Sequence, residues 1–144
     1  MAIVNIRDTG RNSAKTADVR TLATKVQKPS DTEAITAANT ITAAESGTRF
    51  VMNVAAAKVQ TLPTPAAGLE YWFYVGATEP TGTHTIVTAS SANIIVGNVS
   101  SPEDAAGNVA TVTDADTISL VASKAVHGDF VHVWSDGTNW YLDG

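Results

Sequence analysis

The stretch that decides the fold is Leu69-Glu70-Tyr71-Trp72-Phe73-Tyr74-Val75, in which nearly every side chain is apolar or aromatic. Successive side chains of a strand point to opposite faces, so the odd-numbered residues should share one face and the even-numbered residues the other. The odd-numbered set fits a core. The even-numbered set places Trp72 and Tyr74 beside Glu70 on a nominally solvated face. We therefore expect a second contact surface there, against a partner, the N-terminal segment or an identical subunit, unless a loop covers it.

A second stretch, residues 130–135, raises the same question. Two valines alternate with Phe130, His132 and Trp134, so one face is apolar and the other is aromatic. The residues predicted to form an oligomer or partner interface are Trp72, Tyr74, His132 and Trp134.

Outward from these stretches, short runs of apolar and β-branched residues alternate with turn residues. Thr and Val together make up a quarter of the 144 residues, and both types favour strands. Strands recurring about every ten residues predict a sandwich or jelly roll and argue against βαβ units. The predicted strands are 40–43, 49–54, 58–62, 69–75, 85–89, 93–99, 109–113, 117–122, 130–135 and 140–142, with hairpin turns at 45–47 and 136–139.

Charge and aromatic residues divide the chain into two unlike segments. Residues 1–28 hold six of the nine basic residues and a net charge of +4, whereas residues 29–144 carry three basic and twelve acidic residues, a net −9. The first aromatic residue is Phe50. A stretch this poor in large apolar groups cannot offset its ordering entropy by burial alone. We predict an all-β protein with a β-sandwich or jelly-roll-like body at 35–144 and an extended or partly helical N-terminal arm at 1–34.

The arm is expected to gain order only against a partner. Residues 13–27 have the spacing of a short helix, and residues 3–6 suit addition to a sheet edge. A frayed terminus is the alternative. Nucleic acid is a poor match because no aromatic side chain accompanies the basic ones and the body is acidic, so a protein with an acidic groove is expected. The predicted contact residues of the arm are Ile3, Val4, Ile6, Arg7, Arg11, Lys15, Val19, Arg20, Leu22, Lys25, Val26 and Lys28.

Composition also excludes several classes of protein and site. Without cysteine, neither a disulfide framework nor a thiolate metal site can form. No apolar run is long enough to span a membrane, and the first ten residues lack the pattern of a secretory signal. We therefore expect no membrane association and assembly in the cytoplasm. Nucleophile-elbow, phosphate-loop and zinc-helix motifs are absent, so no catalytic residue, metal or cofactor is predicted.

Three weaker candidates for a binding site each have a more common structural explanation. His127 and His132 form a conceivable metal pair, but their odd separation points them to opposite faces of a regular strand. Asp114 and Asp116 offer two carboxylates to Ca²⁺ but lack the remaining oxygen ligands, so a solvated turn is favoured. Trp140-Tyr141 could stack on a sugar ring, although packing into the sandwich is favoured.

Several segments carry a resemblance to a β module of tailed-phage structural proteins, which include head decoration proteins and head or tail fibres. The likeness covers about residues 40–144. It lies in Thr40-Ile41-Thr42-Ala43-Ala44-Glu45-Ser46-Gly47-Thr48, Gln60-Thr61-Leu62-Pro63-Thr64-Pro65-Ala66-Ala67-Gly68-Leu69, Tyr71-Trp72-Phe73, Ile94-Ile95-Val96-Gly97 and Ser135-Asp136-Gly137-Thr138-Asn139-Trp140-Tyr141.

This resemblance implies a small homotrimeric virion protein and no catalytic residues. The expected function is capsid decoration: the body sits on the outer surface of the head and the arm binds the major capsid protein. The alternative is a fibre or spike module that binds host glycans. An enzyme such as a glycan hydrolase ranks last, because it would need a pair of carboxylates set in a cleft.

Overall fold

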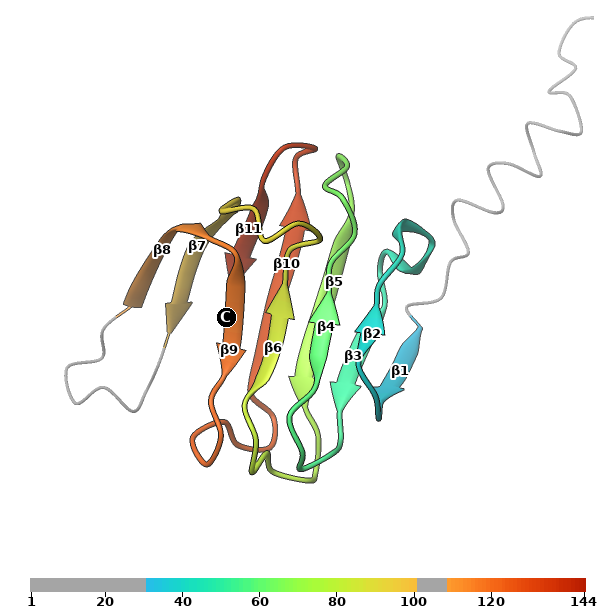
Figure 1. Ribbon diagram of the computed structural model, residues 1–144, viewed down its shortest axis with the longest axis vertical. Coiled ribbons are helices and arrows are strands. Elements are labelled where there is room, and N and C mark those ends of the chain that lie inside the picture. Colours follow the sequence, from blue (N-terminus) through green and yellow to red (C-terminus); the bar gives the residue numbers. More distant parts are fainter. Residues whose placement is uncertain (1–30, 101–108) are drawn as a thin grey trace, which may run out of the picture.

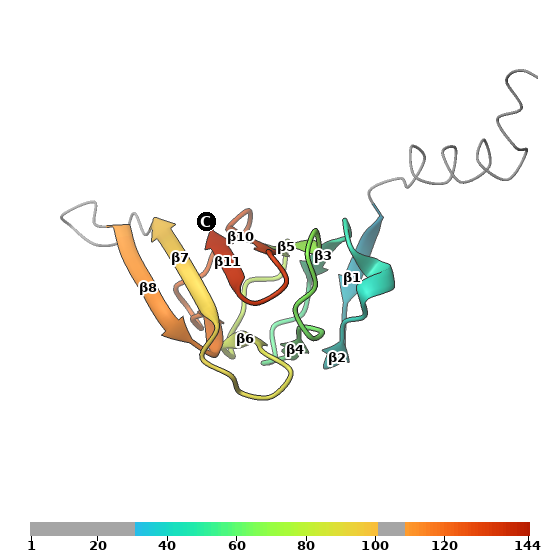
Figure 2. The same ribbon diagram turned by 90° about the horizontal axis from the view of Figure 1, so that it is seen from above.

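The structure is a computed structural model that describes residues 31–100 and 109–144. Within them, a seven-stranded sheet (order β1-β3-β5-β10-β11-β7-β8) packs against a four-stranded sheet (order β2-β4-β6-β9) as a sandwich (Figures 1 and 2). The predicted all-β sandwich is confirmed. The strands are β1 (Thr32–Ile35), β2 (Asn39–Thr40), β3 (Arg49–Met52), β4 (Val59–Thr61), β5 (Glu70–Val75), β6 (His84–Val87), β7 (Ile95–Ser100), β8 (Val109–Ala115), β9 (Thr117–Leu120), β10 (Phe130–Ser135) and β11 (Trp140–Asp143).

The first six strands alternate between the two sheets. β1, β3 and β5 lie side by side in the large sheet, and β2, β4 and β6 lie side by side in the small one. Each passage to the opposite sheet reverses the chain and the next passage restores its direction, so neighbours within each sheet run parallel. The chain thus winds as a short coil, in which each turn contributes one strand to each sheet. Later strands close both sheets, with β9 antiparallel to β6 and β10 antiparallel to β5.

Aromatic side chains from both halves of the chain meet in the core. Phe50, Tyr71, Phe73 and Trp140 are fully buried. The ring of Phe50 stacks on that of Phe73 at 5.4 Å between centroids, and Tyr71 lies 5.8 Å from Trp140. Aromatic pairs at such distances add to the free energy gained by burial. The alternation predicted for residues 69–75 is confirmed, since the odd-numbered residues are all buried.

A short 3-10 helix, η1 (Ala43–Glu45), replaces part of the strand predicted at 40–43. That prediction is wrong beyond Thr40, where β2 ends. The Glu45 carboxylate accepts hydrogen bonds from the backbone N–H and the hydroxyl of Thr42, at 2.7 and 2.6 Å. This cap favours a helical turn, and its Thr-x-x-Glu spacing is visible in the sequence. The Tyr71 hydroxyl donates to the Thr42 carbonyl at 3.0 Å, and burial, aided by the charge of Glu45, raises the pKa of Tyr71 to about 12.

The boundary predicted between arm and body is also displaced. Residues 32–34 were expected in the arm, but they form most of β1, which pairs in parallel with β3. Only Ile35 of this strand is buried, so its sequence has no apolar alternation to reveal it. Long-range backbone pairing orders it instead. The remainder of the predicted arm, residues 1–30, lies outside the described residues.

Gly97 allows β7 to pass close to β11. The register of β7 against β8 shifts between Ile95 and Gly97, and Gly97 has φ +150°. A Cβ built on Gly97 would collide with the backbone carbonyl of Leu142 on β11. Backbone atoms in a paired strand cannot move aside easily, so this position requires glycine.

We expect Gly97→Ala to lower the free energy of unfolding by at least about 2 kcal/mol, because the added methyl both clashes and disfavours the backbone conformation. Urea denaturation followed by tryptophan fluorescence measures this loss. Asn98→Ala, at an exposed position of the same strand, is the matched control and should stay within about 0.5 kcal/mol of the parent. Equal stability of the two variants would contradict the assignment.

Candidate functional site

The outer side of the large sheet presents a ladder of aromatic side chains, which we call the aromatic face. Pairing brings Trp72 opposite His132 and Tyr74 opposite Phe130 across β5 and β10, and Trp134 opposite Tyr141 across β10 and β11. The residues that alternate with these six are buried, so the six share the outer side. The members of the aromatic face are Arg49, Glu70, Trp72, Tyr74, Phe130, His132, Trp134 and Tyr141.

The central row of the aromatic face is a three-layer stack. The rings of Trp72 and His132 lie 4.4 Å apart between centroids and only 7° from parallel. The Arg49 guanidinium covers the Trp72 ring at 5.4 Å from its centroid. Cation–π attraction therefore holds one side of this ring and stacking holds the other.

His132 also lies beside a carboxylate. Its Nε2 is 3.7 Å from a carboxylate oxygen of Glu70, too far for a hydrogen bond, and this nitrogen has no hydrogen-bond partner although it is shielded from solvent. A buried nitrogen without a hydrogen-bond partner is a local cost to the stability of the fold.

The two flanking pairs are stacked in the same way. Trp134 and Tyr141 lie 4.3 Å apart between centroids, and Tyr74 and Phe130 lie 5.6 Å apart. Phe130 is 46% exposed and Trp134 is 43% exposed, the largest exposures of any aromatic side chain in the described residues. The rings thus cover part of one another, while Phe130 and Trp134 remain exposed to solvent.

This arrangement limits what the aromatic face can bind. Sugar recognition by aromatic residues uses a free ring face, but both faces of Trp72 are covered and Trp134 and Tyr141 cover one face of each other. Apart from the second faces of Trp134 and Tyr141, what remains is a ridge of ring edges and apolar carbon flanked by charged groups. Such a surface is typical of protein–protein contacts, in which aromatic residues and arginine are enriched.

Tyr141 is fixed in the aromatic face by the turn that precedes it. The Asp136 carboxylate accepts hydrogen bonds from the backbone N–H groups of Asn139 and Thr138, both at 2.8 Å, and from the Tyr141 hydroxyl at 3.0 Å. These bonds, in that order, lower the pKa of Asp136, and the hydrogen bond to Asp136 raises the pKa of Tyr141. The predicted hairpin turn at 136–139 therefore also orients the ring of Tyr141.

The four residues predicted as a partner interface, Trp72, Tyr74, His132 and Trp134, are all brought together on the aromatic face. Their role as an interface stays a prediction. Sequence reasoning missed Arg49 and Tyr141 as members, because their positions depend on pairing with strands distant in the sequence. Trp140, weighed for stacking on sugars, is fully buried and cannot do so. The predicted contact residues of the arm lie outside the described residues.

The histidines are kept apart. His84 is buried in β6, where its Nδ1 accepts from the Lys58 N–H at 3.1 Å and its Nε2 lies 2.9 Å from the Val54 carbonyl. Because a carbonyl can only accept, Nε2 carries the proton, and the ring serves as a structural bridge between loops. His127 is exposed in the loop before β10. Within 31–100 and 109–144, no three His, Asp or Glu residues are grouped so as to hold a metal ion.

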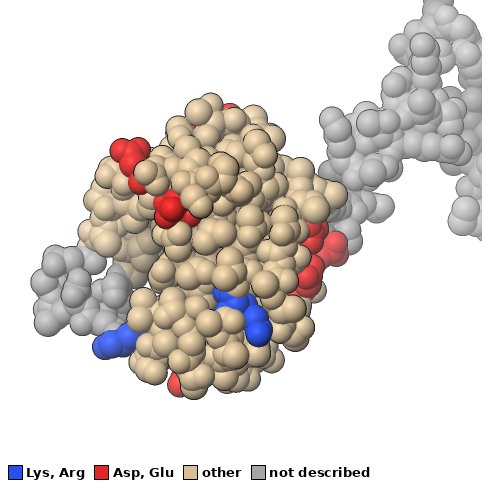
Figure 3. All heavy atoms as spheres, in the orientation of Figure 1, with Lys and Arg blue, Asp and Glu red and all other residues tan. Residues whose placement is uncertain are grey.

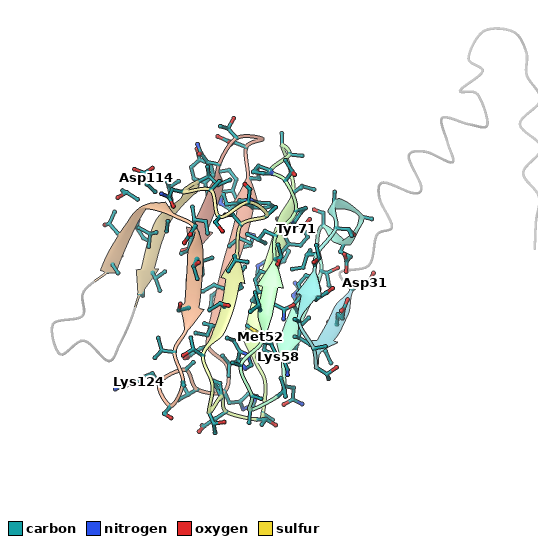
Figure 4. All side chains as sticks on the ribbon, in the orientation of Figure 1. Asp31, Met52, Lys58, Tyr71, Asp114 and Lys124 are labelled. Carbon is teal, nitrogen blue, oxygen red and sulfur yellow. The ribbon has the colours of Figure 1, made fainter. Side chains whose placement is uncertain are left out.

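Charged side chains are scattered over the body. The described residues include three basic ones, Arg49, Lys58 and Lys124, against ten acidic ones. On the face formed by the small sheet, Lys and Arg atoms occupy two small, separate groups (Figure 3). Asp31, Asp114 and Lys124 lie at the periphery, whereas Met52 and Tyr71 lie between the sheets (Figure 4). A body of this charge would repel a polyanion.

A groove of about 560 Å³ opens at one end of the sandwich, between the ends of β7 and β9 and the loop before β10. Its lining is mainly apolar, with Val99, Leu120 and Val126, and includes Lys124 and Asp129. The Asp129 carboxylate already accepts a hydrogen bond from the Val126 N–H at 3.0 Å. Among the described residues that line the groove, Asp129 is the only Asp or Glu, whereas glycoside hydrolysis uses a pair of carboxylates.

Comparison of the chain with protein-family models, with curated proteins and with solved structures finds no match. No helix in the part of the chain that the structure describes is long and apolar enough to cross a membrane. Function must therefore be argued from the geometry of the aromatic face and from the sequence.

We expect His84→Leu to lower the free energy of unfolding by about 2–4 kcal/mol, because it leaves the Lys58 N–H and the Val54 carbonyl without their partner. Thermal and urea denaturation measure the change. His127→Leu, at an exposed position, is the control and should leave stability nearly unchanged. An unaffected His84→Leu protein would show that the bridge is not structural.

Lowering the pH should remove the stabilisation that Asp136 contributes to the fold. Because its pKa is lower in the folded than in the unfolded chain, its stabilisation is present above about pH 4 and is lost as the pH falls through the folded pKa. The stability difference between the parent and Asp136→Ala should therefore shrink as the pH falls. Urea midpoints at about pH 7 and about pH 2.5 test this expectation. Tyr141→Phe keeps the two backbone hydrogen bonds and should retain most of the pH dependence.

Proposed function

We propose that the protein is a structural component of a tailed-phage virion that decorates the outer surface of the head and binds the major capsid protein. The observation that carries the proposal is the aromatic face. A sandwich with a complete core exposes aromatic rings that already cover one another, a surface suited to protein contact and poorly suited to small ligands.

The charge division supports a tethering role for the N-terminal segment. Residues 1–28 carry +4, and the described body carries seven more acidic than basic residues. The chain enters the body at Asp31, whose carbonyl accepts a hydrogen bond from the Arg49 N–H at 2.8 Å, just before the edge strand β1 (Figure 1). A segment joined at the rim of a sheet can bind a neighbouring protein without crossing its own body.

Decoration of this kind would stabilise the head by mass action. A protein that binds only the assembled lattice lowers the free energy of that lattice with each occupied site. Many copies on one surface also gain from multivalency, so individual contacts need not be tight. The homotrimer implied by the resemblance fits this role as part of the proposal.

Deleting residues 1–30 tests the proposal. The truncated protein keeps β1 intact, so it should fold with an unchanged melting temperature and lose binding to undecorated phage heads in a co-sedimentation assay. A full-length variant with the six basic residues of 1–28 changed to Gln should bind at least about tenfold more weakly if electrostatic attraction guides docking. Undiminished binding by the truncated body would reject the tethering role.

The second candidate is a fibre or spike module that binds host glycans. The observation that favours it is the exposure of Trp134 and Phe130 at 43% and 46%. Glycan-array binding by the purified protein, abolished by Trp134→Ala and retained by Val59→Ala on the small sheet, would favour this candidate over decoration.

A further inference from the structure

One row of the aromatic face carries opposite charges at its two ends. Strand pairing aligns Arg49, Trp72, His132 and Asp143 in that order across β3, β5, β10 and β11. Arg49 and Asp143 are both exposed. Neighbouring strands lie about 4.8 Å apart, so the backbones of Arg49 and Asp143 are separated by roughly 14 Å, with the rings of Trp72 and His132 between them. They are therefore too distant to neutralise each other within one molecule.

A two-fold rotation makes this row complementary to itself. An axis parallel to the strands, lying over the boundary between β5 and β10, exchanges the two ends of the row. Arg49 of one copy then faces Asp143 of the second copy, and the symmetry produces this contact twice. The same rotation places Trp72 opposite His132 of the second copy.

The same rotation also brings together residues of the rows on either side. Tyr74 meets Phe130 of the second copy, and Glu70 meets Trp134 of the second copy. Rings thus fill most of the contact, with Glu70 in the third row, while the opposite charges of Arg49 and Asp143 lie at the rim, as in many interfaces. Sheets packed face to face with their strands nearly aligned lie about 10 Å apart, a distance that side chains of this size can fill.

We propose that the aromatic face binds the same face of a second copy of the chain through this two-fold contact. The inference rests on the proposed function for its biological role: it assigns the aromatic face to contact between copies and leaves binding of the major capsid protein to the N-terminal segment. An isologous contact requires that the patch be complementary to itself, and the antisymmetric placement of Arg49 and Asp143 meets that requirement. A trimer held by other surfaces could use the same contact to join its neighbours.

The contact is small. Four strands and three rows cover on the order of 400 Å² in each copy, or about 800 Å² in total, which is less than stable specific interfaces bury and is typical of weak contacts. Free in solution the pair should therefore be weak. Held on one lattice at high local concentration, the same contact would be largely formed.

Sedimentation equilibrium of the full-length chain, from about 10 µM to about 1 mM, tests the proposal over the range expected for a weak interface. We expect reversible self-association in which Arg49→Asp and Asp143→Arg each weaken binding at least about tenfold, because each places two like-charge pairs in the interface. The double variant, with the charges exchanged, should recover affinity to within about threefold of the parent. Trp134→Ser should weaken association, and Val59→Ser, at an exposed apolar position of the small sheet, should not.

Circular dichroism and melting temperature confirm that each variant is folded before its affinity is compared. A parent chain that stays monomeric at the highest concentration overturns the proposal. Self-association that neither single charge reversal weakens, or that the double variant fails to recover, overturns it as well. Head binding measured on the same proteins separates the two ideas. Binding to heads without self-association removes only this inference, whereas self-association without head binding removes decoration.

Discussion

The alternation of side chains along β5 is the constraint on which the rest of the structure depends. This strand lies inside the large sheet between β3 and β10, and it carries aromatic residues on both sides. Tyr71 and Phe73 face inward and organise the core with Phe50 and Trp140. The other side must then expose Trp72 and Tyr74 or cover them. The protein covers them partly, by stacking them against side chains of β3 and β10.

Features encoded by local pattern could be predicted from the sequence. The buried faces of residues 49–52, 69–75 and 130–135 follow from the apolar side chains at every second position, which a one-residue change of register would turn outward. The turn at 136–139 follows from its Asp-Gly-Thr-Asn sequence, in which the Asp136 side chain bonds the backbone that follows it. In both cases the determining contacts lie within a few residues.

Features that depend on distant partners could not be predicted. β1 has one buried residue and exists because its backbone pairs with β3, so nothing in residues 32–35 alone indicates a strand. The parallel winding of the first six strands depends on which sheet each strand joins, a choice that alternation does not specify. Arg49 and Tyr141 belong to the aromatic face only through the pairing of β3 with β5 and of β10 with β11. The surface was thus recognisable in its central residues but not in its extent.

The far edge of the large sheet affects how the protein behaves at high concentration. β8 is a seven-residue border strand paired only to β7 in the described residues, and Val109 at its start is 55% exposed. A long border of unsatisfied amide and carbonyl groups is a template on which other chains can add strands. Asp114 with its positive φ and the irregular register at Gly97 interrupt the flatness that amyloid-like stacking needs. At high protein concentration, these two irregularities would oppose the addition of further strands at this edge.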